Sequence, residues 1–348
     1  MLQKVLAVIL VIACLTVSSV FADDATLDVL VYDSYAVSED LVAAFESENQ
    51  VKLQFIEAGD GTELLNRAIL TKDAPLADVI LGINSVLVAR ALENDLLEPY
   101  AAPALDSIDD KFKVDAENRA LPFDHAGICL NYDTAYFETN GLDVPASLEE
   151  LADPKYKGML AIESPVSSTP GLAFMLLTVD VFGEDGFLDY WNSLVENGAE
   201  IVPDWSTAYY TNFTAGGGDG HQPMVVSYDA SPAAAPFYAE EPMEKAPTAA
   251  IVADKTCFNM IEYIGILKGT DQAALARKFV DAVLSPEWQS DLPGQMFVYP
   301  VNSEATVPEL FETFAPAPRN PVMMDPALVA ASFEKWLQLW SGSVQLNP

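Results

Sequence analysis

The chain has 348 residues, and its 52 aspartates and glutamates outnumber its 17 lysines and arginines, giving a formal charge of −35. So strong a negative charge argues against nucleic acids and anionic membrane surfaces as partners and favours a cationic ligand. Because 51% of the residues are hydrophobic and the chain exceeds the usual size of one compact core, we expect two domains.

The first 22 residues are predicted to be a cleavable secretory signal. Lys4 precedes an apolar run over 5–15 that is too short to span a bilayer, and Ala22 offers a small residue at the cleavage point. The alternative is lipoprotein processing and a lipid anchor at Cys14, which also follows a small residue. In either case we expect the mature protein to be exported, in the periplasm or another extracytoplasmic space.

After this leader the sequence has the pattern of a parallel α/β sheet. Residues 27–31 are an apolar strand candidate, residues 39–48 have one apolar helical face, and residues 51–56 alternate as a second strand. A strand, a helix and a second strand in this order form a βαβ unit, which implies parallel strands. Ligands of such open sheets bind beyond the carboxyl ends of the strands.

Candidate ligand-binding residues follow predicted strands in both halves of the chain. Ser168 and Thr169 either cap a helix or open an anion site at its start, and the sequence favours neither. Trp205 and Tyr209 lie at helical spacing, as core residues or as an aromatic wall. The complete set of candidate ligand-binding residues is Tyr32, Asp60, Gly61, Ser168, Thr169, Trp205, Tyr209, Tyr228 and Phe297.

Two segments are interpreted as crossings between two lobes. A third strand is predicted over 78–81, and the segment over 121–127 leads into a strand over 128–132 that leaves the first lobe. Residues 256–266 are strand-like and apolar, as expected for the return crossing. The predicted organisation is a signal over 1–22, a first lobe over 26–125 plus 262–348, and a second lobe over 126–261.

Sequence patterns of enzymes and metal sites are absent from the chain. None of the motifs G-x-S-x-G, H-E-x-x-H, G-x-x-x-x-G-K-S/T or G-x-G-x-x-G occurs, and no CxxC or Cys/His cluster indicates zinc. We therefore expect no catalysis, no cofactor and no metal ion, and interpret the strand ends as a binding cleft. Cys129 and Cys257 remain after the leader, as a disulfide or as two buried thiols.

The order and spacing of several motifs point to a known family. They are Y-D-S-Y after the first strand, G-D-G-T after the second, A-D-V-I-L-G at the third, F-D-H-A-G at the crossing, then S-S-T-P-G-L, W-S-T-A-Y, S-Y-D-A-S-P and Y-P-V-N. Over nearly the whole mature chain this set resembles the periplasmic thiamine-binding proteins of ABC importers, which are type II periplasmic binding proteins. The resemblance implies an α/β fold of two lobes, each with a mixed, mainly parallel sheet, joined by a hinge.

The resemblance also implies a function. A receptor of this family captures thiamine or a thiamine phosphate in the cleft between its lobes and delivers it to the permease and ATPase subunits of a membrane importer. We expect a monomer with no nucleic-acid partner. The residues that the family places around the vitamin correspond to Tyr32, Asp60, Gly61, Ser168, Trp205 and Tyr228. The chain departs from the family at Ala234, Phe297 and Val166, where a tyrosine, a tryptophan and an arginine are common.

Two alternatives keep part of this interpretation. Adjacent Tyr209 and Tyr210 resemble the tyrosine pair of iron-binding relatives, so the first alternative is a receptor of the same fold for ferric ion or another small solute. Trp205, which stands ahead of them, favours thiamine. The second alternative is an exported enzyme on a similar fold. It requires Cys129 as a cleft nucleophile, whereas the apolar neighbours of Cys129 predict a strand interior.

Overall fold

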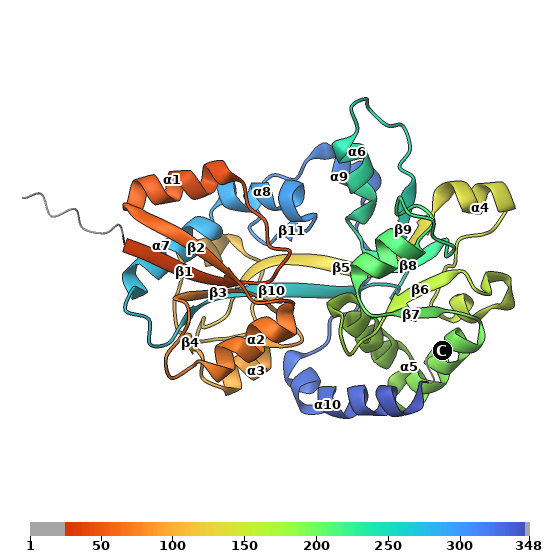
Figure 1. Cartoon of the computed structure of the whole chain (residues 1–348), viewed down its shortest axis with the longest axis horizontal. Helices are drawn as coiled ribbons and strands as arrows, with labels where there is room; N and C mark the ends of the chain where they lie inside the picture. Colours follow the sequence, from red (N-terminus) through yellow and green to blue (C-terminus); the bar gives the residue numbers. More distant parts are fainter. Residues whose placement is uncertain (1–24, 345–348) are drawn as a thin grey trace, which may run out of the picture.

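The structure, a computed structural model of the chain, describes residues 25–344. The predicted signal over 1–22 and the alternative anchor at Cys14 lie outside the described residues. Within residues 25–344, eleven strands form one hydrogen-bonded sheet, and helices cover it on both sides (Figure 1).

The strands are β1 (Ala25–Val31), β2 (Val51–Glu57), β3 (Val79–Asn84), β4 (Leu97–Glu98), β5 (Leu121–Asp133), β6 (Leu160–Glu163), β7 (Glu200–Val202), β8 (Met224–Tyr228), β9 (Thr248–Ile251), β10 (Phe258–Leu267) and β11 (Tyr299–Pro300). The α-helices are α1 (Glu39–Asn49), α2 (Gly61–Leu70), α3 (Val88–Glu93), α4 (Thr134–Asn140), α5 (Thr169–Glu196), α6 (Ala234–Tyr238), α7 (Ala273–Val283), α8 (Pro286–Met296), α9 (Glu309–Phe314) and α10 (Pro326–Ser343). None of the helices in residues 25–344 combines the length and the apolarity that crossing a membrane requires.

Two sets of parallel strands lie at opposite ends of the sheet, and two long strands join them. The strand order is β2-β1-β3-β10-β5-β8-β6-β7, in which β1 is parallel to β2 and β3, and β6 is parallel to β7 and β8. Strands β5 and β10 pair antiparallel with each other and run between the two halves (Figure 1). We call the half built on β1 to β3 the first lobe and the half built on β6 to β8 the second lobe. The predicted two-lobed α/β fold with mixed sheets is thus confirmed.

The inner parallel strands β1 and β3 are largely apolar because helices cover both of their faces. All six residues of β3 are buried, and in β1 the side chains of Leu27, Val29, Leu30 and Val31 are no more than 1% exposed. Side chains that follow the carboxyl end of such a strand are the first that can meet a ligand. The chemistry of the molecule is therefore concentrated at the strand ends.

Two predicted strands differ from those in the structure. β3 continues to Asn84, whereas the sequence predicted its end at Leu81. Gly82 has a φ of +101°, and a Cβ atom there would lie 2.2 Å from Cδ1 of Tyr32, so this glycine provides room for the tyrosine ring and does not end the strand. β5 is one strand of 13 residues, whereas the sequence predicted a strand only over 128–132.

Cys129 and Cys257 form a disulfide, with their Cα atoms 4.4 Å apart. Cys129 lies on β5, and Cys257 directly precedes β10. Because Ile128 and Phe258 are cross-strand partners, the antiparallel pairing of the crossing strands brings the two cysteines together. The structure therefore selects the disulfide from the two states that the sequence left open.

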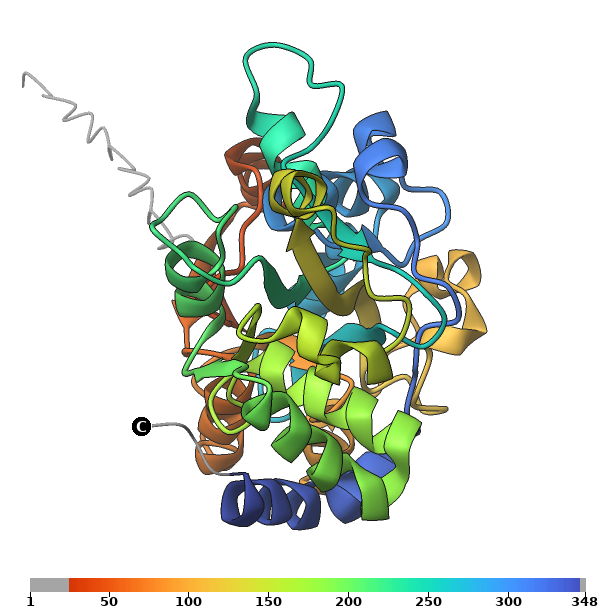
Figure 2. The same ribbon diagram turned by 90° about the vertical axis from the view of Figure 1, so that its right-hand side faces the viewer.

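The C-terminal helix α10 contacts both lobes. The rings of Trp340 and Trp191 of α5 meet edge to face with centroids 5.2 Å apart, and Nε1 of Trp336 donates a hydrogen bond of 2.7 Å to Oε1 of Glu184. The same helix packs on α3 of the first lobe. Figure 2 shows α10 along the base of the molecule, next to α5. The sequence predicted that residues 262–348, which include α10, belong to the first lobe. Because α10 contacts both lobes, its contacts do not favour one lobe, and the predicted lobe boundaries stay a prediction.

We expect Trp336→Ala to lower the free energy of unfolding by about 3–5 kcal/mol, because it removes a large buried ring and one of the hydrogen bonds to Glu184. Leu328→Ala changes a half-exposed residue of the same helix and should cost less than about 1 kcal/mol. Urea unfolding followed by circular dichroism measures both. Equal losses for the two variants would contradict docking of α10 through Trp336.

Candidate functional site

The strand ends of the first lobe place polar groups at one edge of the sheet. Tyr32 follows β1, and Asp60 and Gly61 follow β2, which runs parallel to β1. Asp60 is the N-cap of α2, since its Oδ1 accepts hydrogen bonds from the backbone N–H groups of Thr62 and Glu63 at 2.9 and 3.2 Å. Asp60 therefore has a structural role in addition to any contact with a ligand.

The strand ends of the second lobe carry an aromatic wall. Trp205 follows β7, and Tyr228 ends β8, with the two ring centroids 6.2 Å apart. Trp205 also stacks on Tyr209 at 5.0 Å. Its Nε1 donates a hydrogen bond of 2.9 Å to Oγ of Ser227, which fixes the orientation of the indole. The structure thus brings three of the candidate residues into one group.

Tyrosines from both lobes meet two carboxyl groups that we did not predict as site residues. Burial, and after it the charges of Glu262 and Asp124, raise the pKa of Tyr32 well above its usual range. Burial and the charges of the same two carboxyls, together with Glu163, also raise the pKa of Tyr228. The acids lie on the crossing strands, between the lobes. Tyr32 and Tyr228 therefore flank a common acidic floor.

The acidic floor consists of Asp124 and Glu262, which are direct cross-strand partners on β5 and β10. Burial, and then the charge of Glu262, raises the pKa of Asp124 well above its usual range. Burial raises the pKa of Glu262 to about 7, although a side-chain hydrogen bond with Tyr32 opposes the rise. A cation placed between these carboxyls would favour their charged forms.

Glu163, at the end of β6, is a third acid that we did not predict as a site residue. Its side chain is fully buried, and neither carboxylate oxygen has a hydrogen-bond partner. Burial raises its pKa to about 8, and the charge of Asp204 acts in the same direction. A carboxyl in such surroundings is mostly protonated at neutral pH.

A sequence signal for these acids exists in retrospect. Glu163 ends the apolar segment M-L-A-I-E, and Glu262 interrupts F-N-M-I-E-Y-I-G-I-L. A charged residue within a run that is otherwise fit for a buried strand is costly to bury, so it marks a functional position. Asp124 stood in the motif at the crossing but was not predicted as a ligand contact.

A pocket of about 270 Å³ is lined by both lobes and by α10, but by no residue of the acidic floor or the aromatic wall. Asp60 lines it from the first lobe, and Ser168 and Thr169 line it from the start of α5. Ser168 is the N-cap of α5, yet its side chain makes no capping hydrogen bond, so its hydroxyl is available. Val166 is 58% exposed on the wall of the pocket, and Arg90 of α3 supplies a cation there.

Phe297 lies in a different aromatic cluster. Its ring contacts Phe237, Tyr238 and Phe311, with centroids 5.6 to 5.8 Å apart, and among the described residues it makes no ring contact with another candidate. Gly61 is the first residue of α2, where a Cβ atom would lie 3.1 Å from Nδ2 of Asn84. The roles of Phe297 and Gly61 as ligand contacts stay predictions.

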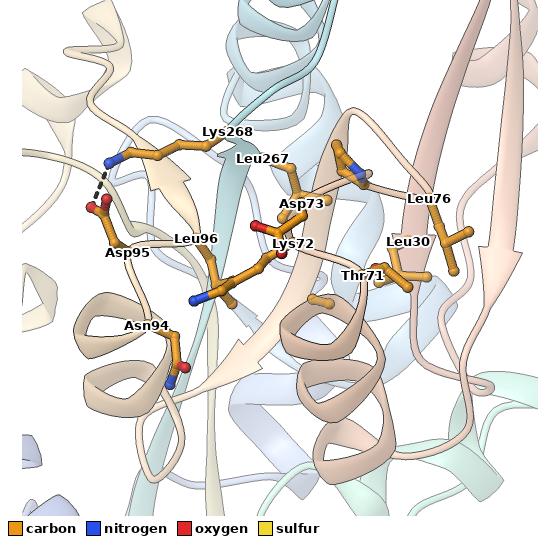
Figure 3. A pocket seen from close by; sticks show the side chains of 12 residues that line it. Leu30, Thr71, Lys72, Asp73, Leu76, Asn94, Asp95, Leu96, Leu267 and Lys268 are labelled. Carbon is orange, nitrogen blue, oxygen red and sulfur yellow. Dashed lines mark hydrogen bonds and ion pairs between the residues drawn. The ribbon is translucent and has the colours of Figure 1, made fainter.

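A second pocket, of about 260 Å³, lies away from the predicted residues. Figure 3 shows its lining, which includes Leu30, Lys72 and the ion pair of Lys268 with Asp95. It adjoins the loop before β3, at the opposite end of that strand from the cleft. Among residues 25–344, no three histidine, cysteine or acidic side chains are grouped so as to hold a metal ion.

Two lobes joined by crossing strands, with tyrosines of both lobes around an acidic floor, define a two-lobed solute-binding protein. The chain belongs to the bacterial extracellular solute-binding protein family, which it matches over residues 74–319. The thiamine-binding periplasmic protein of Escherichia coli K12 is 29% identical, with 99% of each chain covered. These findings confirm the family inferred from the sequence motifs.

Solved structures agree with this assignment. A periplasmic thiamin binding protein has 27% sequence identity and a TM-score of 0.79, covering 92% of this chain and 96% of its own. The ferric binding protein from Campylobacter jejuni has a TM-score of 0.74 at 14% identity, covering 91% of this chain and 99% of its own. This second likeness concerns the fold alone.

We expect Glu163→Gln to flatten the pH dependence of stability. A folded-state pKa of about 8 means that wild type retains a proton that the unfolded chain has lost, so wild type loses stability as pH rises from about 4.5 to 8, by roughly 1.4 kcal/mol per pH unit. The variant carries no such proton. Urea unfolding of the empty protein between pH 5 and pH 8 measures the difference.

Glu196→Gln is the matched control for this measurement, because Glu196 is exposed at the end of α5 and is solvated in both states. The free energy of unfolding of this variant should change with pH in the same way as that of wild type. If Glu163→Gln also runs parallel to wild type, the carboxyl of Glu163 is charged in the folded protein and the argument from its burial is wrong.

Proposed function

We propose that the chain is an extracytoplasmic receptor of an ABC importer that binds thiamine or a thiamine phosphate between its lobes and delivers it to the membrane permease. The observation that carries this proposal is the acidic floor of Asp124 and Glu262 between two tyrosines, one from each lobe. Thiamine combines a cationic thiazolium with an aminopyrimidine ring. Carboxylates and aromatic faces together suit such a ligand.

The similar proteins support the same ligand. The names of the Escherichia coli relative and of the solved structure both state thiamine, and the relative matches along almost the whole chain. Both are binding proteins by name, which agrees with a receptor that performs no catalysis. We extend the ligand, and with it the permease and ATPase partners, to this chain by inference.

Binding between the lobes couples ligand capture to closure. Because Tyr32 and Tyr228 belong to different lobes, a ligand that touches both stabilises the closed arrangement. A separate pocket between the lobes has the start of α5 in its lining, and we infer that a hydroxyethyl or phosphate group of the ligand reaches the N–H groups near Ser168 and Thr169. Arg90 lines the same pocket and is the cation suited to a phosphate.

The ferric alternative is supported by the fold but less well by the tyrosines. The rings of Tyr209 and Tyr210 are 5.4 Å apart at 76°, and their environments differ. Tyr209 stacks on Trp205, whereas Tyr210 is 54% exposed. A site for a hard cation requires phenolate oxygens that converge on one point. We therefore favour thiamine.

Calorimetric titration of the full chain with thiamine, thiamine monophosphate and thiamine diphosphate should give one saturable site for at least one of the three. We expect this because the thiazolium of the ligand is cationic and its rings are aromatic, which suits the carboxyl groups of the acidic floor and the tyrosines that flank it. No heat and no thermal shift with any of them would overturn the vitamin as ligand. A visible phenolate-to-iron absorption band after addition of ferric citrate would favour the ferric alternative instead.

Tyr32→Ala should weaken thiamine binding about tenfold or more, because it removes an aromatic face and the hydroxyl that interacts with Glu262. The empty protein should still fold, with a lower melting temperature, because the ring of Tyr32 packs on Gly82. Tyr136→Ala, on α4 of the second lobe, is the matched control and should bind as wild type does. A variant at Tyr32 that fails to fold would show that this ring belongs to the core.

A further inference from the structure

The crossing strands place two carboxyl groups opposite each other. Asp124 and Glu262 are direct cross-strand partners, and such residues in antiparallel strands share a face, with Cβ atoms about 4.5–5.5 Å apart. Asp124 is only 1% exposed. Oδ2 of Asp124 and Oε2 of Glu262 are both buried without a hydrogen-bond partner. The fold itself therefore leaves this acid pair unsatisfied.

Two phenols lie within the electrostatic reach of the acid pair. The charges of both carboxyls act on Tyr32, in the loop after β1, and on Tyr228, at the end of β8. No salt bridge among the described residues includes either carboxyl. The positive charge that would balance two carboxylates is therefore not supplied by residues 25–344.

His125 follows Asp124 on β5 but does not neutralise it. Successive side chains of a strand point to opposite faces, and the ring of His125 is stacked between Phe112 and Tyr299. Burial, and then the charge of Lys111, lowers its pKa to about 4, so His125 is neutral at physiological pH. Other charges act on the neighbouring rings, namely Glu163 on Tyr228, Asp229 on Tyr299, Asp291 on Tyr35 and Lys111 on His125.

Two carboxyls at this distance in a buried site do not both ionise, because each charge raises the energy of the other. The pair titrates as a unit and holds a proton above the pH at which a single exposed carboxyl would lose it. The raised pKa values of Asp124 and Glu262 agree with this geometry.

We propose that Asp124 and Glu262 form a proton-linked cation selector, which shares one proton while the cleft is empty and releases it to solvent when a cationic ligand takes its place. This inference rests on the proposed function and specifies how the same site is regulated. The proton leaves as the positive charge of the ligand arrives, so the charge of the cleft is conserved. A neutral molecule of the same shape gains no such exchange and is discriminated against.

Proton release makes affinity depend on pH. At pH values where the acid pair of the empty protein still holds its proton, each unit of rising pH should tighten thiamine binding by up to about tenfold. The affinity should level off at the pH where the pair of the empty protein has already lost that proton. Import would therefore be favoured at neutral or alkaline pH and weakened in acid.

Calorimetry in two buffers tests the exchange directly. Titration of the full chain with thiamine at pH 6.5, in phosphate and in imidazole, counts released protons because the two buffers differ in ionisation enthalpy. We expect about one proton per thiamine for wild type. Asp124→Asn should release close to none and bind thiamine about tenfold or more weakly at pH 7.5. Glu262→Gln should likewise release close to no protons and bind thiamine more weakly. It replaces Asp124→Asn in the test if that variant fails to fold.

Asp28→Asn is the matched control. Asp28 lies in the middle of β1, next to Asp78, and burial followed by the charge of Asp78 raises its pKa, so it belongs to a second acid pair apart from Asp124 and Glu262. The variant should release as many protons as wild type. A wild type that binds thiamine without releasing a proton, or an Asp124→Asn variant that releases as many, overturns the proposal.

Infrared spectra of the empty protein separate this inference from the identity of the ligand. Between pH 6 and pH 7, the difference between wild type and Asp124→Asn should contain the carbonyl stretch of a protonated carboxyl. Its absence refutes proton storage, whatever the ligand is. If the stretch is present but thiamine gives no heat, proton storage is supported, and both the proposed ligand and the release step that depends on it are overturned.

Discussion

The antiparallel pairing of β5 and β10 is the constraint on which the rest of the molecule depends. It is the hydrogen-bonded link between the two sets of parallel strands, so it holds the lobes at one distance. The same pairing sets Asp124 opposite Glu262 at the point where both strands pass between the lobes. A single register thus determines both the architecture and the chemistry of the cleft floor.

Charge acts at two ranges in this protein. The excess of carboxylates over the whole surface produces a long-range field that attracts any cation and carries little selectivity. At short range, buried and unneutralised acids admit a cation only when its shape lets it shed water and contact the surrounding rings. The attraction of cations therefore depends on the composition of the chain, whereas the selection among cations depends on its fold.

The sequence was most informative where periodicity is strong and local. The first βαβ unit and the strand-end positions of Tyr32, Trp205 and Tyr228 follow from residues close together in the chain, and the family follows from short motifs that each span only a few residues. Helix α8 was not predicted, because Pro293 interrupts an otherwise helical segment, although Ser285 caps its start. The acid pair was missed because its members lie far apart in the chain, and only the register of two distant strands brings them together.

The disulfide between Cys129 and Cys257 determines how the crossing strands can deform. It ties them together on the second-lobe side of the acid pair, where neither strand can then slide past the other. On the first-lobe side the register of β10 against β5 shifts between Glu262 and Tyr263, and an irregularity of this kind bends a strand. The covalent link and the irregularity therefore stand on opposite sides of the acid pair.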